Sequence, residues 1–267
     1  MSGASDNGNG RLVAIVGGAH GIGEATATLL ASRGWRLAVA DLDVEGARAT
    51  ASRIGGTAVE VDVLDAGSIG RAAESIEREG GPVYGLVNAA ALFQRREPPE
   101  SLPQDEWDRI VAAGHRGTYV GMVEFGRRMA ARGAGAIVNI SSMVGERPNH
   151  GHAYCSAKAA VNALTEGFAG EWGRSGVRVN AVSPGFVGVP RMLENIRAGK
   201  RYAVSPAELA ALGRLVEPGE VAESIAFLLS DRASGITGAN LLVDAGVFAA
   251  GGWAVNGGVP PARVREG

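Results

Sequence analysis

Short apolar runs alternate with longer amphipathic segments along most of the chain. The apolar runs predict β-strands at 12–16, 37–40, 58–61, 83–87, 136–140, 177–182 and 240–243. The segments between them, with apolar residues at helical spacing, predict helices at 21–33, 44–54, 66–78, 103–132, 152–174 and 218–230. Strands that alternate with helices form parallel sheets, and continuously apolar strands are buried on both faces. The pattern therefore predicts an α/β fold: a doubly wound, seven-stranded parallel sheet flanked by helices.

No repeat or break in composition divides the chain, so we expect a single domain over residues 11–250. Residues 1–10 are polar and rich in Gly, Ser and Asn, which predicts a disordered tail and not a signal peptide. Residues 190–215 follow the sixth strand and have no strand of their own, so they are a candidate substrate lid. Residues 251–267 form a C-terminal extension.

The composition fits a soluble enzyme. Of the 267 residues, 46% are hydrophobic and 20% are charged, and the formal net charge is -2. A chain so close to neutral lacks the basic surface that attracts nucleic acids or anionic membranes. None of its apolar runs is long enough to span a bilayer. The single cysteine, Cys155, excludes an internal disulfide and fits a reducing compartment, so we expect a cytoplasmic protein.

A glycine-rich turn separates the first strand from the first helix. Gly17 allows a tight turn, Gly21 allows close approach of a pyrophosphate, and Gly23 lets the helix pack on the strand. The start of the helix then faces the phosphates with free N–H groups and the positive end of its dipole. The turn therefore predicts a dinucleotide site.

Asp41 ends the second predicted strand, where a carboxylate can accept hydrogen bonds from both ribose hydroxyls of an adenosine. That carboxylate repels a 2′-phosphate, so the sequence predicts NAD as the cofactor and not NADP. His20 has two interpretations, as a residue of the turn or as a weak positive charge near a 2′-phosphate. We expect Asp41 to dominate.

A second pattern, Tyr154-Cys155-Ser156-Ala157-Lys158, carries acid–base chemistry. Tyr154 and Lys158 are four residues apart in a predicted helix, so both side chains lie on one face, one turn apart. A lysine cation there favours the tyrosinate. Ser141 and Ser142 end the fifth strand a dozen residues earlier, and a serine hydroxyl nearby can hydrogen-bond the substrate oxygen that exchanges the proton.

With these motifs the chain resembles the classical short-chain dehydrogenase/reductase family over about residues 12–248. Besides the glycine turn, Tyr154 and Lys158, the resemblance rests on Asp62-Val63, Leu86-Val87-Asn88-Ala89, Ile140-Ser141-Ser142, Arg178-Val179-Asn180-Ala181-Val182-Ser183-Pro184-Gly185, Ile236-Thr237-Gly238 and Val243-Asp244. It implies a Rossmann-type fold, a nicotinamide cofactor, a small-molecule substrate, and a homotetramer or homodimer. It also implies that Ser142, Tyr154 and Lys158 are catalytic, with Ser142 preferred over Ser141.

The resemblance implies cofactor contacts by position as well. Asp62 and Val63 would contact the adenine. Asn88 would lie against the adenosine ribose, and Val187 would meet the nicotinamide carboxamide. The expected cofactor-binding residues are Gly17, His20, Gly21, Ile22, Gly23, Asp41, Leu42, Asp62, Val63, Asn88, Ala89, Ala90, Tyr154, Lys158, Pro184, Gly185 and Val187. Asn88 and Asn180 also have a structural interpretation, as caps of backbone groups near strand ends.

The chain departs from the family pattern at several positions. Gly114 stands where the family has an asparagine that anchors a water of the proton relay. Two interpretations stay open: a kink in the helix frees a carbonyl that holds the water, or the relay is broken. Val16 and Val189 each replace a threonine of the family pattern, and Ala91 replaces a glycine. His115 is either a substitute for the asparagine or a surface histidine.

The remaining histidines and arginines have two interpretations each. His150 and His152 line the substrate mouth or a solvated loop; no carboxylate or thiolate stands at metal-ligand spacing, so no metal is expected. Basic residues gather on two stretches expected to face the substrate, namely Arg95, Arg96, Arg191, Arg197, Lys200 and Arg201. They indicate an anionic or strongly polar substrate, or only a solvated helix face.

The sequence therefore predicts an NAD-dependent oxidoreductase that interconverts a secondary alcohol and a ketone by hydride transfer, with tyrosine as acid and base. The alternative is a catalytically weakened member of the family that binds nucleotide as a regulatory or scaffold subunit. The complete Ser142, Tyr154 and Lys158 set favours the enzyme. The departures from the family pattern keep the alternative open.

Overall fold

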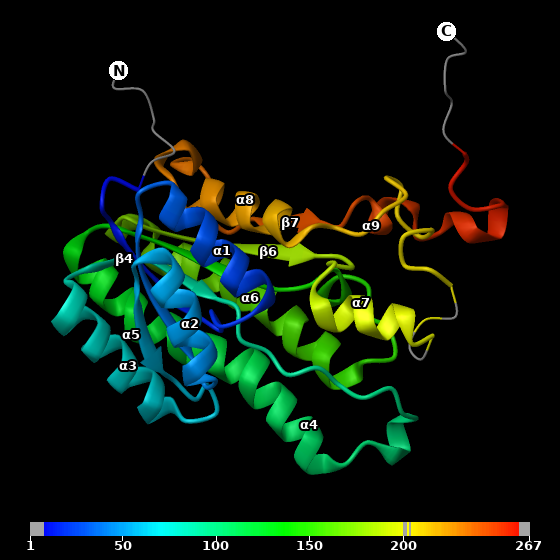
Figure 1. The fold of residues 1–267 in the computed structure, drawn as a ribbon, viewed down its shortest axis with the longest axis horizontal. Helices are drawn as coiled ribbons and strands as arrows, with labels where there is room; N and C mark the ends of the chain where they lie inside the picture. The colour runs from blue at the N-terminus through cyan, green and yellow to red at the C-terminus, as the bar shows by residue number, and fades with distance from the viewer. Residues whose placement is uncertain (1–7, 200–201, 203, 262–267) are drawn as a thin grey trace, which may run out of the picture.

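A sheet of seven parallel strands forms the centre of the molecule in a computed structural model that describes residues 8–199, 202 and 204–261 (Figure 1). The strands lie in the order β3-β2-β1-β4-β5-β6-β7. Their bounds are β1 Leu12–Val16, β2 Arg36–Asp41, β3 Thr57–Glu60, β4 Val83–Asn88, β5 Gly135–Ile140, β6 Val177–Pro184 and β7 Asn240–Val243. Each begins and ends within two residues of its predicted run, which confirms the single-domain, Rossmann-type α/β fold.

Helices cover both faces of this sheet (Figure 1). One face is covered by α1 Gly21–Ser32, α2 Val44–Ile54 and α8 Pro218–Leu229. The other is covered by α3 Ala66–Gly80, α5 Gly117–Arg132 and α6 His152–Trp172. Successive side chains of a strand point to opposite faces, and β1 shows this directly. Val13 and Ile15 pack in the hydrophobic core under α1, α2 and α8, whereas Ala14 and Val16 pack in the core under α3, α5 and α6.

The predicted helical stretch over 103–132 is confirmed, but it is not regular along its length. The structure has α4 Gln104–Val111, a π-helical turn over Ala112–Arg116, and then α5. A π-helical turn inserts a residue into a helix and changes the apolar period little, so the sequence pattern does not reveal it. Glycine is required where α5 begins, because an added Cβ at Gly117 would lie 2.9 Å from the Val63 carbonyl oxygen.

The candidate lid at 190–215 contains a helix that the pattern did not predict, α7 Pro190–Arg197. Its eight residues hold too few apolar positions for a period to stand out. A parallel bridge between Val187 and Val216 brings the two ends of the segment together. Two of the predicted basic residues of this segment, Lys200 and Arg201, lie outside the described residues, and the role as a lid stays a prediction.

Residues 1–7 of the predicted tail lie outside the described residues, but residues 8–10 form a turn that belongs to the fold. Gly8 N–H donates to the Arg33 carbonyl at 2.9 Å, so the prediction of disorder is wrong for these three residues. The chain continues past β7 through α9 Val247–Ala250 and a 3₁₀ turn at Trp253–Asn256. No helix within the described ranges combines the length and the apolarity needed to cross a membrane.

Candidate active site

The glycine turn closes tightly between β1 and α1. Gly17 has a φ of 87°, and a Cβ there would clash with the backbone of Ala90; a Cβ on Gly23 would clash with the Gly17 carbonyl. Gly21, with a φ of 58°, is different: among the described residues, the one heavy atom within 4 Å of an added Cβ would be Val189 Cγ1, at 3.4 Å. The backbone is therefore open on one side at the start of α1, which fits a dinucleotide pyrophosphate.

Asp41 ends β2 and holds the glycine turn in place. The Ala19 N–H donates to its Oδ2 at 2.9 Å, and the Asp43 N–H donates to its Oδ1 at 3.1 Å. The His20 ring lies 2.6 Å from Asp43 Oδ2. The Gly46 N–H and this ring both lower the pKa of Asp43. A second carboxylate therefore stands near the one predicted to bind ribose, and it offsets the charge of a protonated His20.

Asp62 and Val63 follow β3, near the start of α3. The Leu64 N–H donates to Asp62 Oδ1 at 2.8 Å, and the Asp62 N–H donates to Ser68 Oγ at 3.0 Å. Val63 is half-buried, and its carbonyl faces Gly117 at the start of α5. These contacts shape the loop between β3 and α3, and the adenine contact stays a prediction.

Asn88, at the end of β4, is buried, and the structure does not support its interpretation as a backbone cap. Its Nδ2 donates to Asn139 Oδ1 at 2.9 Å, and Asn139 Nδ2 donates to Thr165 Oγ1 at 3.0 Å, so the three side chains link β4, β5 and α6. The capping interpretation holds for Asn180. Its Nδ2 donates to the Ile236 carbonyl at 2.9 Å, and its Oδ1 accepts from the Ala239 N–H.

The loop after β6 is packed closely against the loop after β7. The Gly185 N–H donates to the Val243 carbonyl at 3.0 Å, and a Cβ on Gly185 would lie 2.7 Å from Asp244 Cα. Pro184 ends β6, and Val187 is buried. This packing explains why glycine follows Pro184 and leaves the backbone from 185 to 187 fixed beside the site.

The predicted cofactor residues come together at one edge of the sheet. They follow the carboxyl ends of parallel strands, where open α/β sheets bind their ligands. Two further predicted residues differ in exposure. Ile22, within the glycine turn, is half-buried, whereas Leu42, which follows Asp41, is 63% exposed. The predicted residues at this edge are Gly17, His20, Gly21, Gly23, Asp41, Asp62, Val63, Asn88, Ala89, Ala90, Pro184, Gly185 and Val187.

The two serines that follow β5 are both buried, but their hydroxyls differ. Ser141 Oγ donates to the backbone carbonyl of Lys158 at 3.0 Å, so its proton is used to hold α6 against β5. Ser142 Oγ accepts a long contact, 3.4 Å, from the Val144 N–H and caps the turn at Met143–Gly145. An accepting hydroxyl keeps its own proton for another partner. This difference supports the choice of Ser142.

Tyr154 and Lys158 lie one turn apart on α6, as predicted. The Lys158 side chain is buried, its Nζ lies 5.7 Å from the centroid of the Tyr154 ring, and its Nζ donates to the Ile140 carbonyl at 2.6 Å. Burial lowers the pKa of Lys158 to about 8. The ammonium is therefore mostly charged at neutral pH, beside the tyrosine ring and without a carboxylate bonded to it in the described residues.

The π-helical turn places Gly114 against α6. Gly114 is buried, and a Cβ there would lie 3.3 Å from Ala157 Cβ, one residue before Lys158. Thr118 Oγ1 donates to the Gly114 carbonyl at 2.9 Å. The helix is irregular at Gly114, as the first of the two interpretations requires. His115 lies in the same turn and is half-buried.

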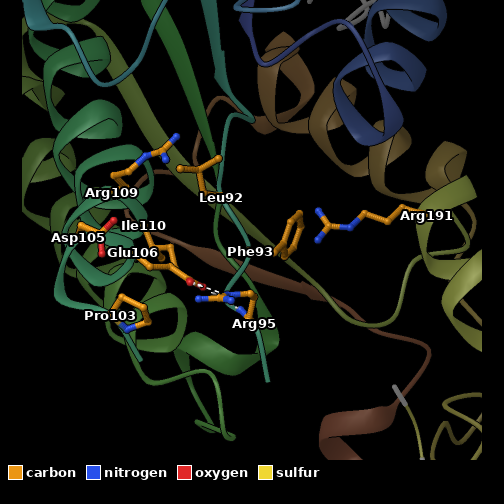
Figure 2. A pocket seen from close by; sticks show the side chains of 9 residues that line it. All are labelled: Leu92, Phe93, Arg95, Pro103, Asp105, Glu106, Arg109, Ile110 and Arg191. Carbon is orange, nitrogen blue, oxygen red and sulfur yellow. Dashed lines mark hydrogen bonds and ion pairs between the residues drawn. The ribbon is translucent and has the colours of Figure 1, made fainter. Parts of the chain in front are cut away.

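A cavity of about 390 Å³ opens between the loop after β4, α4 and α7 (Figure 2). It is lined by Leu92, Phe93, Arg95, Pro103, Asp105, Glu106, Arg109, Ile110 and Arg191. Arg95 is held by Glu106, with Nε to Oε2 at 2.6 Å, whereas Arg191 reaches from α7 towards the Phe93 ring (Figure 2). Of the predicted basic residues, Arg95 and Arg191 therefore line the cavity.

Sequence reasoning missed two residues beside Tyr154. The Phe93 ring stacks on the Tyr154 ring with centroids 5.2 Å apart, and the Gln94 side chain is buried. Gln94 Oε1 accepts the N–H of Ala153 at 2.8 Å. Both belong to a loop without periodicity, so their contacts have no signature in the sequence.

The histidines do not converge on a metal site. His150 and His152 are both exposed. No group of three or more His, Cys, Asp or Glu side chains within the described ranges is placed to hold a metal ion.

The chain matches a family model described as enoyl-(acyl carrier protein) reductase over residues 17–248. It is 37% identical to D-threitol dehydrogenase of Mycolicibacterium smegmatis, with 89% of this chain and 93% of that protein covered. It is 38% identical to cis-4-hydroxycyclohexanecarboxylate dehydrogenase of Sinomonas cyclohexanicum, with 90% and 97% covered.

Solved structures resemble it over most of its length. A structure described as ribose-5-phosphate isomerase from Brucella melitensis 16M has a TM-score of 0.93 and 43% identity, with 96% of this chain and 100% of that chain covered. The structure of levodione reductase has a TM-score of 0.86 and 30% identity, with 90% and 98% covered.

Proposed function

Because this chain belongs to the classical short-chain dehydrogenase/reductase family, we propose that it is an NAD-dependent oxidoreductase that interconverts a secondary alcohol and a ketone. The observation that carries the proposal is the buried ammonium of Lys158, 5.7 Å from the ring of Tyr154. Free tyrosine ionises at about pH 10. A nearby cation lowers its pKa, and this makes the tyrosine a usable base at neutral pH.

Tyr154 is the proposed acid and base. As the tyrosinate it takes the proton of the substrate alcohol during oxidation, and as the neutral phenol it gives the proton back during reduction. The Ser142 hydroxyl donates a hydrogen bond to the substrate oxygen and holds it within reach of Tyr154. Ser141 donates its hydroxyl proton to the Lys158 carbonyl, which supports Ser142, and not Ser141, as the residue that binds the substrate oxygen.

The glycine turn and Asp41 are the proposed NAD site. NAD, when bound, supplies the acceptor for the hydride of the alcohol carbon. The open backbone at Gly21 would hold the pyrophosphate, and the unused lone pairs of the Asp41 carboxylate would accept the ribose hydroxyls. Asp43 adds a second negative charge nearby and supports the preference for NAD over NADP.

The substrate is proposed to be a small polar alcohol. The cavity has as one wall Phe93, whose ring stacks on Tyr154, and it mixes the apolar side chains Leu92, Phe93 and Ile110 with charged ones. D-Threitol dehydrogenase and galactitol 2-dehydrogenase, among the relatives, are named for polyols. A hydroxylated molecule of similar size would find both hydrogen-bonding groups and apolar walls in this cavity.

The name of the Brucella structure suggests a different reaction, the isomerisation of a sugar phosphate. An aldose–ketose isomerisation moves hydrogen within one molecule and needs no dinucleotide. The tight glycine turn and Asp41 have no use in that reaction. A dinucleotide-binding measurement therefore separates the two functions.

The test is NADH formation from a panel of secondary alcohols that includes threitol, galactitol and cis-4-hydroxycyclohexanecarboxylate. We expect absorbance of NADH to rise with at least one of them and little signal with NADP. Tight NAD binding without turnover of any alcohol, or of the matching ketones with NADH, would favour the scaffold alternative. No NAD binding together with sugar-phosphate isomerisation would favour an isomerase.

We also propose that the protein is cytoplasmic and forms a homotetramer, or a homodimer, as the family resemblance implies. Light scattering of the purified chain gives the mass of the assembly directly. A monomer at micromolar concentration would contradict this part of the proposal.

A further inference from the structure

Helix α6, which carries Tyr154 and Lys158, begins without a cap of its own. Its N-cap residue is Gly151, which has no side chain to accept a hydrogen bond from the first turn. The first N–H groups of any helix lack partners inside the helix, and a Ser, Thr, Asp or Asn at the N-cap normally accepts one of them. The first turn of α6 needs such an acceptor from elsewhere.

Gln94 supplies it from the loop after β4. Its Oε1 accepts the N–H of Ala153, the second residue of α6, at 2.8 Å. Its Nε2 points to the His150 carbonyl, just before the helix, at 3.5 Å. The amide orientation follows from the chemistry, because a backbone N–H can only donate and so requires the oxygen of Gln94. The Gln94 side chain is 4% exposed, so little water competes for this bond.

Tyr154 is the next residue, so it lies in the turn that Gln94 caps. The residue before Gln94, Phe93, stacks on the Tyr154 ring with an interplanar angle of 28°. Gln94 therefore holds the backbone at Ala153, and its neighbour Phe93 contacts the ring of Tyr154. Lys158, one turn later, is fixed separately through the bond from its Nζ to the Ile140 carbonyl of β5.

The spacing between Tyr154 and Lys158 therefore depends on two anchors. Ile140 fixes the lysine, and Gln94 fixes the first turn. Uncapped helix ends fray, and a small displacement of a reacting group costs a large factor in rate. Fraying of this turn would move the Tyr154 ring relative to the Lys158 ammonium.

We propose that Gln94 is a positioning residue for Tyr154: its side-chain carbonyl supplies the acceptor that the N-cap Gly151 lacks and keeps the phenol beside the Lys158 ammonium. This inference rests on the proposed function, in which Tyr154 transfers the proton. Gln94 acts through the helix, by its bond to the Ala153 N–H.

The main variant is Gln94→Met, which keeps the length of the side chain and removes the oxygen. We expect kcat for alcohol oxidation to fall about tenfold or more at pH 7, with the dissociation constant of NAD unchanged. Since the tyrosinate loses part of the lysine field, the pH at which kcat reaches half its maximum moves upward. Gln94→Glu, which still accepts from the Ala153 N–H and carries a charge that suits a helix N-terminus, restores the maximal kcat towards wild type. Its negative charge near the tyrosinate keeps the midpoint of the pH profile above that of wild type.

The matched control is Gln104→Met, the same substitution at an exposed residue that starts α4. It leaves kcat and its pH profile unchanged. A loss of packing alone would lower the melting temperature of Gln94→Met without moving the pH profile, and that outcome overturns the proposal.

Hydrogen exchange measured by mass spectrometry tests the cap without any substrate. In Gln94→Met, the peptide over 151–158 should exchange at least tenfold faster, whereas later turns of α6 should not change. Unchanged exchange overturns the inference about Gln94. A wild-type protein that oxidises no alcohol overturns the proposed function instead, and the exchange result still decides whether Gln94 caps α6.

Discussion

The hydroxyl of Thr118 donates a hydrogen bond of 2.9 Å to the carbonyl of Gly114, across the π-helical turn that joins α4 to α5. A carbonyl oxygen has two lone pairs, and this bond uses one of those of Gly114. Any side chain at position 114 would also press on Ala157, whose Cβ lies 3.3 Å from an added Cβ. These contacts favour the interpretation in which the backbone at Gly114 takes the place of the missing asparagine, which stays a prediction.

This relationship predicts the result of Gly114→Asn. We expect turnover to stay the same or to fall, because the new side chain crowds Ala157 beside Lys158 and occupies the space next to the carbonyl. Steady-state kinetics in H₂O and D₂O measure both turnover and the solvent isotope effect. Gly114→Ala, which adds the crowding without the amide, is the control. A several-fold gain in turnover with a smaller isotope effect would mean that the relay is broken in the natural protein.

Tyr154→Phe should remove nearly all turnover and leave the affinity for NAD largely unchanged. The phenol is required for proton transfer, an effect of roughly 10²–10⁴-fold, and not for holding the dinucleotide. Lys158→Ala should weaken both turnover and NAD binding. Tyr84→Phe is the matched control, because the Tyr84 hydroxyl contacts Asp231 at 3.5 Å on the surface. Substantial activity in Tyr154→Phe would disprove the assigned base.

The cofactor preference should depend on the charge of Asp41. A 2′-phosphate beside this carboxylate would cost on the order of a few kcal/mol, so we expect NADH to bind at least tenfold tighter than NADPH. Asp41→Asn removes the charge and keeps an oxygen for the Ala19 N–H, so it should narrow the difference without opening the glycine turn. Fluorescence titration gives both dissociation constants. Equal binding of NADPH to the natural protein would instead make His20 the phosphate ligand.

Burial of Lys158 predicts how stability depends on pH. Its pKa falls from 10.5 to about 8 on folding, which corresponds to about 3 kcal/mol. Below pH 8 both states hold the proton, and the folded state bears the full cost of a buried ammonium. Between pH 8 and 10.5 the unfolded chain binds the proton and the folded chain does not, so the free energy of unfolding rises with pH.

Lys158→Met removes this dependence and should be the more stable protein at pH 7, by up to about 3 kcal/mol. The gap should close as the pH approaches 10. Urea unfolding of both proteins from pH 7 to 10 measures it, and subtraction of the two curves cancels every other titrating group. A variant that is less stable than wild type at pH 7, by an amount that does not change with pH, would contradict the assignment.

Arg191 should contribute to substrate binding, because it reaches into the cavity beside Phe93. A hydrogen bond from its guanidinium to a polar or anionic group predicts a KM about tenfold higher in Arg191→Ala, with kcat little changed. Arg197→Ala, at the far end of α7, is the control. Equal KM values for all three proteins would support the interpretation of these arginines as a solvated helix face.

The central strands were predictable because both faces of the sheet are covered there, so that β1 and β5 are buried along their whole length. The glycine turn was predictable because Gly17 and Gly23 have no room for a Cβ. The π-helical turn was not, since an inserted residue hardly changes the apolar period. The contact of Gln94 with Ala153 joins residues 59 apart in the chain, and only the folded molecule brings them together.

The order of the strands has a consequence for how the protein is made. β2 and then β3 add to one side of β1, and β4, β5, β6 and β7 add one after another to the other side. Each strand that leaves the ribosome therefore finds its partner already synthesised, and the sheet can grow outward as translation proceeds. A ribosome that stalls after β4 would expose the glycine turn and Asp41 in a chain that still lacks both Tyr154 and Lys158. Nucleotide binding by such stalled chains would precede any chemistry.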